Sequence, residues 1–136
     1  FLPGKNGETK ETLKKTLKLA KELKPDTAQF FPIMVYPGTR AYSWAIENDY
    51  LTTTNFDEWL TQDGLHNCVV SRPGLSNFEL VEFCDFARRD FYLRPSYILS
   101  KIPTALTDAN EFKRLLKGAQ HLFKYIFRGT FAKREV

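Results

Sequence analysis

The chain has 136 residues, of which 43% are hydrophobic and 15% aromatic, and its formal net charge is +4. A chain of this size buries roughly two-thirds of its unfolded surface, so its composition excludes a disordered protein and predicts one domain. No apolar run approaches the ~20 residues of a membrane span, and no signal-peptide pattern opens the sequence. We therefore expect a cytoplasmic protein without a membrane span.

The basic residues are spread over helix faces and are densest between positions 10 and 24. A solvated helix face explains such a run, which argues against a nucleic-acid partner. The two cysteines, Cys68 and Cys84, lack the Cys-x-x-Cys or Cys-x-x-His spacing of a metal site. We read both as reduced thiols and predict no metal ligands in this chain.

The first nine residues form a glycine-punctuated turn that leads directly into a helix. Gly4 and Gly7 permit positive φ or a close backbone approach, and the helix after Glu8 begins with unpaired N–H groups. Such a corner suits an anionic or polar ligand. Only Phe1 and Leu2 are apolar ahead of it, so we expect the chain to begin inside a strand, as a piece of a larger protein.

A helix is predicted from Thr9 to Lys24. Its apolar residues recur at helical spacing and form one buried stripe: Leu13, Leu17, Ala20 and Leu23. Thr9 is the expected N-cap, and Pro25 ends the helix because proline cannot continue the hydrogen-bond ladder.

The next run, Thr27 to Tyr36, is apolar, β-branched and aromatic, which predicts a buried strand. Pro32 lacks a ladder N–H and places this strand at an edge or next to a bulge. The strand ends in the turn Tyr36-Pro37-Gly38-Thr39, and a helix follows from about Arg40 to Asn48. The order is β-α-β-α with a parallel strand pair, so residues 4–9 and 36–39 should be neighbours at one rim.

The remainder of the chain is predicted to be helical after a long connection, which contains a short helix around Asp57–Leu60. Capping boxes start two helices, at Ser76 with Glu79 and at Asp108 with Glu111, and Gly129 ends the second. Pro95 separates the first from a short helix over 97–102. The domain organisation is therefore α/β over residues 1–48, a connection over 49–75 and an all-α extension over 76–136, which is α-rich overall.

No catalytic residue can be named from the sequence. The two histidines, His66 and His121, have no neighbour that would build a nucleophile or a metal cage, and we read both as structural or surface residues. The sequence alone indicates a ligand-binding rim without a reacting group.

The loops add a resemblance. Five successive segments together resemble the second half of the radical S-adenosylmethionine (SAM) barrel. They are Gly4-Lys5-Asn6-Gly7-Glu8-Thr9, a Leu/Lys helix, a Pro-Asp turn, an aromatic strand and Tyr36-Pro37-Gly38-Thr39. The most similar branch is the cobalamin-associated one, which includes the anaerobic magnesium-protoporphyrin IX monomethyl ester cyclases. The stretch from Ala87 to Pro95 resembles its C-terminal extension. Asn6 and Val35 replace prolines of that branch.

The resemblance implies an iron–sulfur oxidoreductase or cyclase that acts on an organic substrate such as a tetrapyrrole. It implies that Gly4, Gly7 and Glu8 shape the adenosyl side of the SAM pocket, and that Tyr36, Pro37, Gly38 and Thr39 close the adjoining rim. The family's Cys-x-x-x-Cys-x-x-Cys is not in this sequence. By analogy, the [4Fe–4S] cluster, most SAM contacts and any cobalamin would belong to an N-terminal half upstream of Phe1, and the fragment alone would be inactive.

Two further expectations concern partners. The alternative to an enzyme fragment is a free-standing helical module that binds a protein or anionic partner through Arg88, Arg89, Arg94 and the Lys-rich helix. A strand edge that has lost its neighbour is a template for pairing, so we also expect self-association through the run from Thr27 to Val35.

Overall fold

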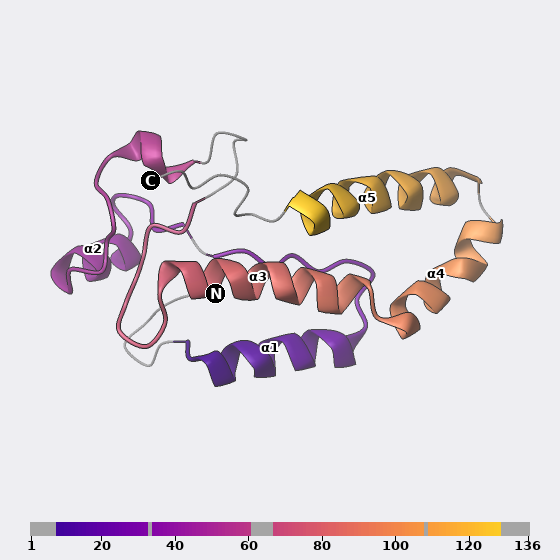
Figure 1. Ribbon diagram of the computed structural model, residues 1–136, viewed down its shortest axis with the longest axis horizontal. Coiled ribbons are helices and arrows are strands. Elements are labelled where there is room, and N and C mark those ends of the chain that lie inside the picture. The colour runs from indigo at the N-terminus through magenta and orange to yellow at the C-terminus, as the bar shows by residue number, and fades with distance from the viewer. Residues whose placement is uncertain (1–7, 33, 61–66, 108, 129–136) are drawn as a thin grey trace.

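The structure is a computed structural model that describes residues 8–32, 34–60, 67–107 and 109–128. These residues are predominantly helical, which confirms the α-rich prediction (Figure 1). The elements are α1 (Lys10–Leu23), α2 (Arg40–Glu47), the short 3-10 helix η1 (Phe56–Trp59), α3 (Asn77–Tyr92), α4 (Pro95–Thr107) and α5 (Ala109–Arg128).

Helix α1 begins and ends where the sequence predicts. The Thr9 hydroxyl accepts a hydrogen bond from the Thr12 N–H, and the Thr12 hydroxyl accepts one from the Thr9 N–H, so two free donors of the first turn are satisfied. Lys24 follows the helix in the left-handed conformation, with φ of 48°, and Pro25 comes next. Leu13 and Leu17 form the buried stripe, whereas Leu23 is 70% exposed.

Helices α1 and α3 lie side by side and run in the same direction (Figure 1). Ion pairs join them at both ends: Lys10 Nζ lies 2.6 Å from Glu79 Oε1, and Lys21 Nζ lies 2.6 Å from Asp90 Oδ2. Both pairs join residues 69 positions apart. The constant offset shows that the two helices keep one register over their shared length.

Residues 26–32 return along α3 in an extended conformation, but they do not form the predicted strand. The exposure of the side chains alternates here from one residue to the next, as it does in a strand. Ala28 is half-buried, and Phe30 and Pro32 are buried. The residues between and before them, Thr27, Gln29 and Phe31, are exposed. A strand also requires a neighbouring strand to complete its ladder, and no strand lies beside these residues in the described part of the chain. Among residues 8–48 that the structure describes, the predicted strand over 27–36 is therefore absent, and the predicted strand at Phe1 and Leu2 lies outside the described residues.

Side chains of α3 and α4 take the place of a partner strand. The Tyr92 hydroxyl accepts from the Ala28 N–H at 2.9 Å and donates to the Ala28 carbonyl at 2.8 Å. Arg88 Nε donates to the Phe30 carbonyl at 3.1 Å, and the Tyr97 hydroxyl donates to the Asp26 carbonyl at 2.8 Å. The segment is thus held on the helices by backbone hydrogen bonds along one edge.

Three groups of buried side chains form the core among the residues that the structure describes. The first joins the start of α1 to α3 and the connection, through Leu13, Cys68, Leu75, Leu80 and Val81. The second joins the middle of α1 and the extended segment to α3, through Leu17, Phe30, Cys84, Ala87 and Phe91. The third lies around α2 and η1 and consists of Val35, Ala45, Trp59, Val69 and Val70.

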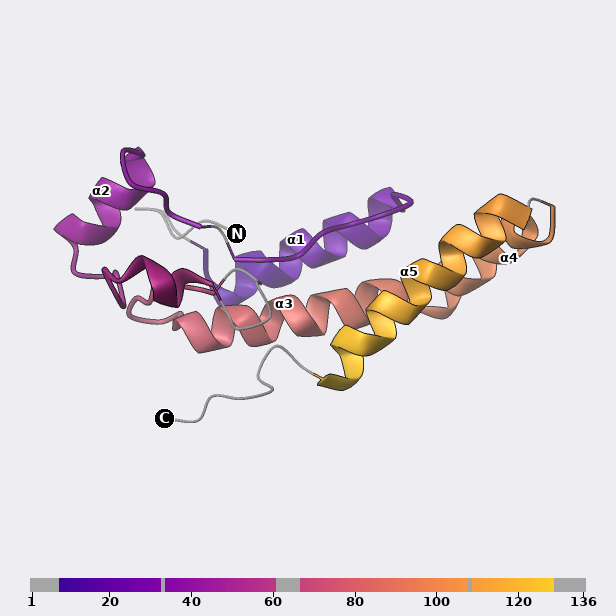
Figure 2. The same cartoon turned by 90° about the horizontal axis from the view of Figure 1, so that it is seen from above.

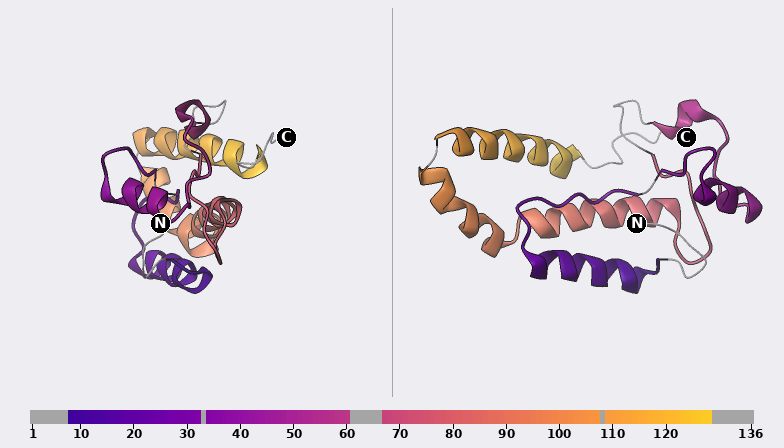
Figure 3. Two further views of the ribbon diagram at one scale, coloured as in Figure 1. Left: turned by 90° about the vertical axis from the view of Figure 1, so that its left-hand side faces the viewer. Right: turned by 180° about the vertical axis from the view of Figure 1, so that it is seen from behind.

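Helices α4 and α5 form an arm that extends from the end of α3 (Figures 2 and 3). Pro95 separates α3 from the next helix, as the sequence predicts, but α4 begins at Pro95 itself and continues through Pro103 to Thr107, so it is longer than the predicted helix over 97–102. The capping residue Asp108 and the end signal Gly129 lie outside the described residues. Within the described chain, no helix is both long enough and apolar enough to cross a membrane.

Candidate functional site at the start of α1

The candidate site is built around Glu8, the residue immediately before the N-cap of α1. Gly4 and Gly7, predicted to belong to the same site, lie outside the described residues. The Glu8 side chain is half-buried, and its Oε2 atom has no hydrogen-bond partner among the residues that the structure describes. Burial raises the pKa of this carboxyl above its ordinary value, although the Arg72 guanidinium opposes the rise. Glu8 is therefore an acceptor with unused capacity.

Arg72 is the functional candidate that the sequence reading missed. Its guanidinium Nη2 donates to the Glu8 backbone carbonyl, and its Nε has no partner in the described part of the chain. A tight turn positions it: Arg72 and Leu75 exchange backbone hydrogen bonds, and Gly74 between them has φ of +84°. The Arg72-Pro73-Gly74 signature could have indicated this turn, but nothing in the sequence indicates that it lies beside Glu8.

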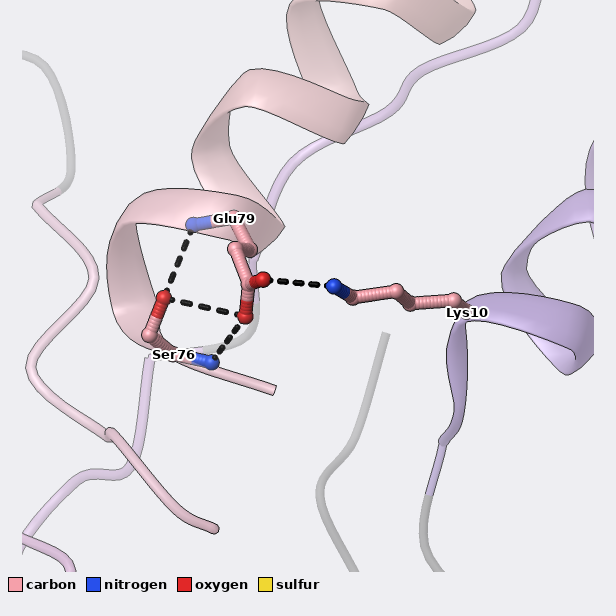
Figure 4. Close-up of polar contacts among 3 residues, drawn as sticks. All are labelled: Lys10, Ser76 and Glu79. Carbon is pink, nitrogen blue, oxygen red and sulfur yellow. Dashed lines mark hydrogen bonds and ion pairs between the residues drawn. The ribbon is translucent and has the colours of Figure 1, made fainter. Parts of the chain in front are cut away.

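An ion pair holds the start of α1 in place. Figure 4 shows Lys10 Nζ in contact with Glu79, whose other carboxylate oxygen accepts from the Ser76 N–H at 2.9 Å. The predicted capping box of α3 is thereby confirmed, since the Ser76 hydroxyl also accepts from the Glu79 N–H. The first turn of α1, and with it Glu8, is fixed against the first turn of α3.

The second predicted loop forms a turn that caps α2. The Thr39 N–H and hydroxyl donate to the Tyr36 carbonyl at 3.1 and 2.7 Å, and Gly38 has φ of +83°, a conformation that favours glycine. The Thr39 hydroxyl also accepts from the Tyr42 N–H at 3.2 Å. Tyr36, Pro37, Gly38 and Thr39 are all exposed.

The start of α1, which follows Glu8 and Thr9, and the turn before α2 lie at the same end of the described structure, away from α4 (Figure 1). Among the described residues, no hydrogen bond joins Glu8 to residues 36–39, so the structure does not link these two parts of the predicted site through hydrogen bonds. The arrangement presents two helix N-termini and a half-buried carboxylate. It can accept hydrogen bonds from a polar or cationic ligand.

The cysteines do not add a metal centre to this site. Cys68 and Cys84 are buried thiols, and burial raises the pKa of the Cys84 thiol to about 12. Thiols bind metals as thiolates, so a thiol with this pKa is a poor ligand. The described residues contain no group of three potential metal ligands. His66 lies outside the described residues, and His121 lies in α5.

The arginines proposed for an anionic partner do not form one free face. Arg88 contacts both the Phe30 carbonyl and Asp85, at 3.1 and 3.2 Å. The Arg94 guanidinium lies 4.2 Å from the Phe91 ring centroid and 5.5 Å from that of Tyr97. Only Arg89 is exposed. Two of the three arginines therefore support the fold.

Comparisons with known proteins give one informative similarity. No protein-family model matches the chain, and no solved structure matches it. The chain is 34% identical over 102 residues to an uncharacterized methyltransferase of Pyrococcus horikoshii, an alignment that includes 75% of this chain. It covers 21% of the Pyrococcus protein, so the chain spans about a fifth of the length of this relative.

Proposed function

We propose that the chain is the C-terminal portion of a longer SAM-dependent enzyme of the radical SAM class, which we call the parent. The similarity to an uncharacterized methyltransferase supports a parent that uses SAM, because SAM is both a common methyl donor and the precursor of radical chemistry. The loop sequences around Glu8 and Thr39 support the radical SAM class in particular. We propose an organic substrate for the parent, with a tetrapyrrole as the first candidate, and an oxidoreductase or cyclase reaction.

The unused carboxylate oxygen of Glu8 is the observation on which this proposal depends. A half-buried acceptor without a partner costs free energy unless a ligand supplies a donor. The ribose hydroxyls and the amino group of SAM are donors of this kind. Gly4 and Gly7 would allow the backbone to approach the ligand, and residues 36–39 would close the adjoining rim.

The extended segment also fits a barrel in the parent. Residues 26–32 have the alternating exposure of a strand and pack on α1 and α3 through one face. In the parent, we propose, this segment is a strand of the partial barrel, α1 is the crossover helix before it, and α3 to α5 cover the substrate side.

The residues present fit SAM only in part and do not fit an iron–sulfur cluster. Two buried cysteines, one with a thiol pKa of about 12, cannot replace the three or four thiolates that hold a [4Fe–4S] cluster. We assign the cluster and any cobalamin to the upstream half of the parent. Anaerobic treatment of the 136-residue chain with iron and sulfide should then yield no stoichiometric cluster absorbance and no activity.

The experiment is to express the complete gene and measure SAM binding by calorimetry under anaerobic conditions. We expect a Cys-x-x-x-Cys-x-x-Cys upstream of Phe1 and SAM binding that Glu8→Gln weakens about tenfold or more, since a charged hydrogen-bond acceptor is lost. Glu11→Gln, which changes an exposed carboxylate in the first turn of α1, is the matched control. An upstream sequence without the cysteine motif, or equal affinities of the two variants, would contradict the proposal.

A further inference from the structure

The backbone of Glu8 depends on a hydrogen-bond donor from outside α1. The first carbonyl that accepts a bond within the helix belongs to the N-cap Thr9, which receives the Leu13 N–H at 3.0 Å. The Glu8 carbonyl lies one residue earlier and is therefore outside the helical ladder. Among the described residues, the Arg72 guanidinium supplies its donor through Nη2. This contact joins residues 64 positions apart and holds the residue from which the Glu8 side chain leaves the backbone.

Arg72 is itself held at both ends of its side chain. Its backbone exchanges hydrogen bonds with that of Leu75 at 3.2 and 3.4 Å. Leu75 is 4% exposed and packs with Leu13 and Leu80 in the first core group, so the turn that carries Arg72 is anchored between α1 and α3. A contact at each end restricts the rotamers of a long side chain, which are otherwise numerous. Arg72 therefore reaches Glu8 from a fixed base.

The charge of Arg72 also favours the ionised form of Glu8. The Arg72 Nε atom is buried without a hydrogen-bond partner, and among the residues that the structure describes the guanidinium makes no ion pair. Burial raises the pKa of the Glu8 carboxyl, and the guanidinium opposes this rise. An ionised carboxylate accepts hydrogen bonds on both oxygens, whereas a protonated carboxyl carries a donor on one of them. The guanidinium thus supports the form of Glu8 with the greater capacity to accept.

We infer that Arg72 is a positioning residue for Glu8: it holds the Glu8 backbone at the start of α1 and thereby directs the carboxylate toward SAM. The inference rests on the proposed function, because it assigns Arg72 a part in the binding that is proposed there. It adds a residue from the connection over 49–75, to which the family resemblance assigns no role in binding. Arg72 acts through Glu8 rather than on SAM directly.

A double-mutant cycle on the complete protein tests this role. Calorimetry under anaerobic conditions gives the SAM dissociation constants of the wild type, Arg72→Gln, Glu8→Gln and the double variant. Arg72→Gln removes the charge and shortens the side chain, so it should weaken SAM binding about fivefold or more. In the Glu8→Gln background the same change should alter the affinity by less than about twofold. A purely structural role of Arg72 would instead weaken binding equally in both backgrounds.

Two further variants complete the experiment. Arg72→Lys keeps a positive charge and a donor on a long side chain, so it should bind SAM at least about twofold more tightly than Arg72→Gln. Arg89→Gln is the matched control, because Arg89 is exposed in the last turn of α3 and undergoes the same chemical change. It should bind SAM like the wild type. Far-UV circular dichroism should show that every variant is folded, and Arg72→Met, which retains the apolar stem, replaces Arg72→Gln in the cycle if that variant does not fold.

The outcomes separate this inference from the proposed function. If Glu8→Gln weakens SAM binding but Arg72→Gln binds SAM as tightly as Arg89→Gln, the positioning role is overturned and the proposed function stands. Equal effects of Arg72→Gln in the two backgrounds would have the same meaning. If Glu8→Gln binds SAM like the wild type, the proposed function is overturned and the role of Arg72 falls with it.

Discussion

Lys21 Nζ lies 2.6 Å from Asp90 Oδ2 and joins the last turn of α1 to the last turn of α3. Lys10 and Glu79 make the same contact at the other end, with the same sequence offset. The two contacts lie three helical turns apart and flank the buried stripe of Leu13 and Leu17. They flank the face of α1 that packs on α3.

A double-mutant cycle should measure this contact. The side chains of Lys21 and Asp90 are only about one-third exposed. Surface ion pairs typically have coupling free energies of about 0.2–1 kcal/mol. The cycle of Lys21→Ala and Asp90→Ala should therefore give a value near the upper end of this range, about 1 kcal/mol. The control cycle is Lys18→Ala with Glu22→Ala, an exposed pair within α1, for which we expect about 0.3 kcal/mol. Denaturant unfolding gives both values, and equal couplings would mean that the α1–α3 contact adds nothing beyond a surface pair.

The Glu79 carboxyl should make stability depend on acidic pH. Its hydrogen bond with Lys10, followed by those with Ser76, lowers its pKa from 4.5 to about 2. A carboxyl whose pKa is lower in the folded than in the unfolded state stabilises the fold at pH values above its unfolded-state pKa. This stabilisation is lost as the pH falls through the folded-state pKa. The free energy of unfolding should therefore decline as pH falls from 4.5 toward 2, and Glu79→Gln should remove part of that decline. Glu82→Gln changes an exposed carboxyl on the same helix and should leave the acidic decline in stability unchanged. If the free energies of unfolding of the two variants depended on pH in the same way, the prediction would be contradicted.

The Tyr92 hydroxyl should stabilise the fold through the backbone of Ala28. Tyr92→Phe removes one group that both donates and accepts, and it leaves a partly buried N–H and C=O without their partner. We expect the free energy of unfolding to fall by about 1–2 kcal/mol. Tyr36→Phe removes a hydroxyl from a side chain that is 54% exposed, so it should change the free energy of unfolding by less than about 0.5 kcal/mol. Chemical denaturation of both variants checks this, and a Tyr92→Phe effect no larger than the control would exclude the role of the hydroxyl.

Cys84 should be unreactive while the chain is folded. The thiol is fully buried, and burial raises its pKa to about 12, so it remains protonated at pH 8. We expect alkylation by iodoacetamide to be slow in buffer and rapid in denaturant, as followed by mass spectrometry of the labelled peptide. Cys84→Ala provides the blank for this peptide. Rapid labelling of Cys84 under native conditions would show that the second core group opens locally.

The helices could be predicted from sequence because their signals are local. Thr9 and Ser76 each cap a helix through residues three positions away, and Pro25 and Pro95 end or begin helices through backbone chemistry alone. The strand prediction over Thr27–Tyr36 failed for the opposite reason. The alternating pattern is present, but a strand is defined by a neighbour, and α3 side chains occupy one edge in its place.

The site was predictable only in part. Glu8 and the turn at Tyr36–Thr39 are signalled by glycine and capping residues, and the structure places both at one end of the fold. Arg72 could not be found from sequence, because its contact with Glu8 spans 64 positions and depends on how the connection folds back. The partners of Arg88 and Arg94 could not be found from sequence either. Their charges suggested a binding face, but Arg88 donates to the distant Phe30 carbonyl and Arg94 lies over aromatic rings.

The parallel alignment of α1 with α3 has a consequence for the order of folding. Their contacts close a loop of 69 positions, whereas α4 and α5 are adjacent in sequence and pack on each other. Contacts between distant segments form more slowly, because the entropy of loop closure opposes them before any packing is gained. We expect the α4–α5 hairpin to form first and α1 to dock on α3 last. The half-buried carboxylate of Glu8, which depends on that docking, would be assembled only in the final step.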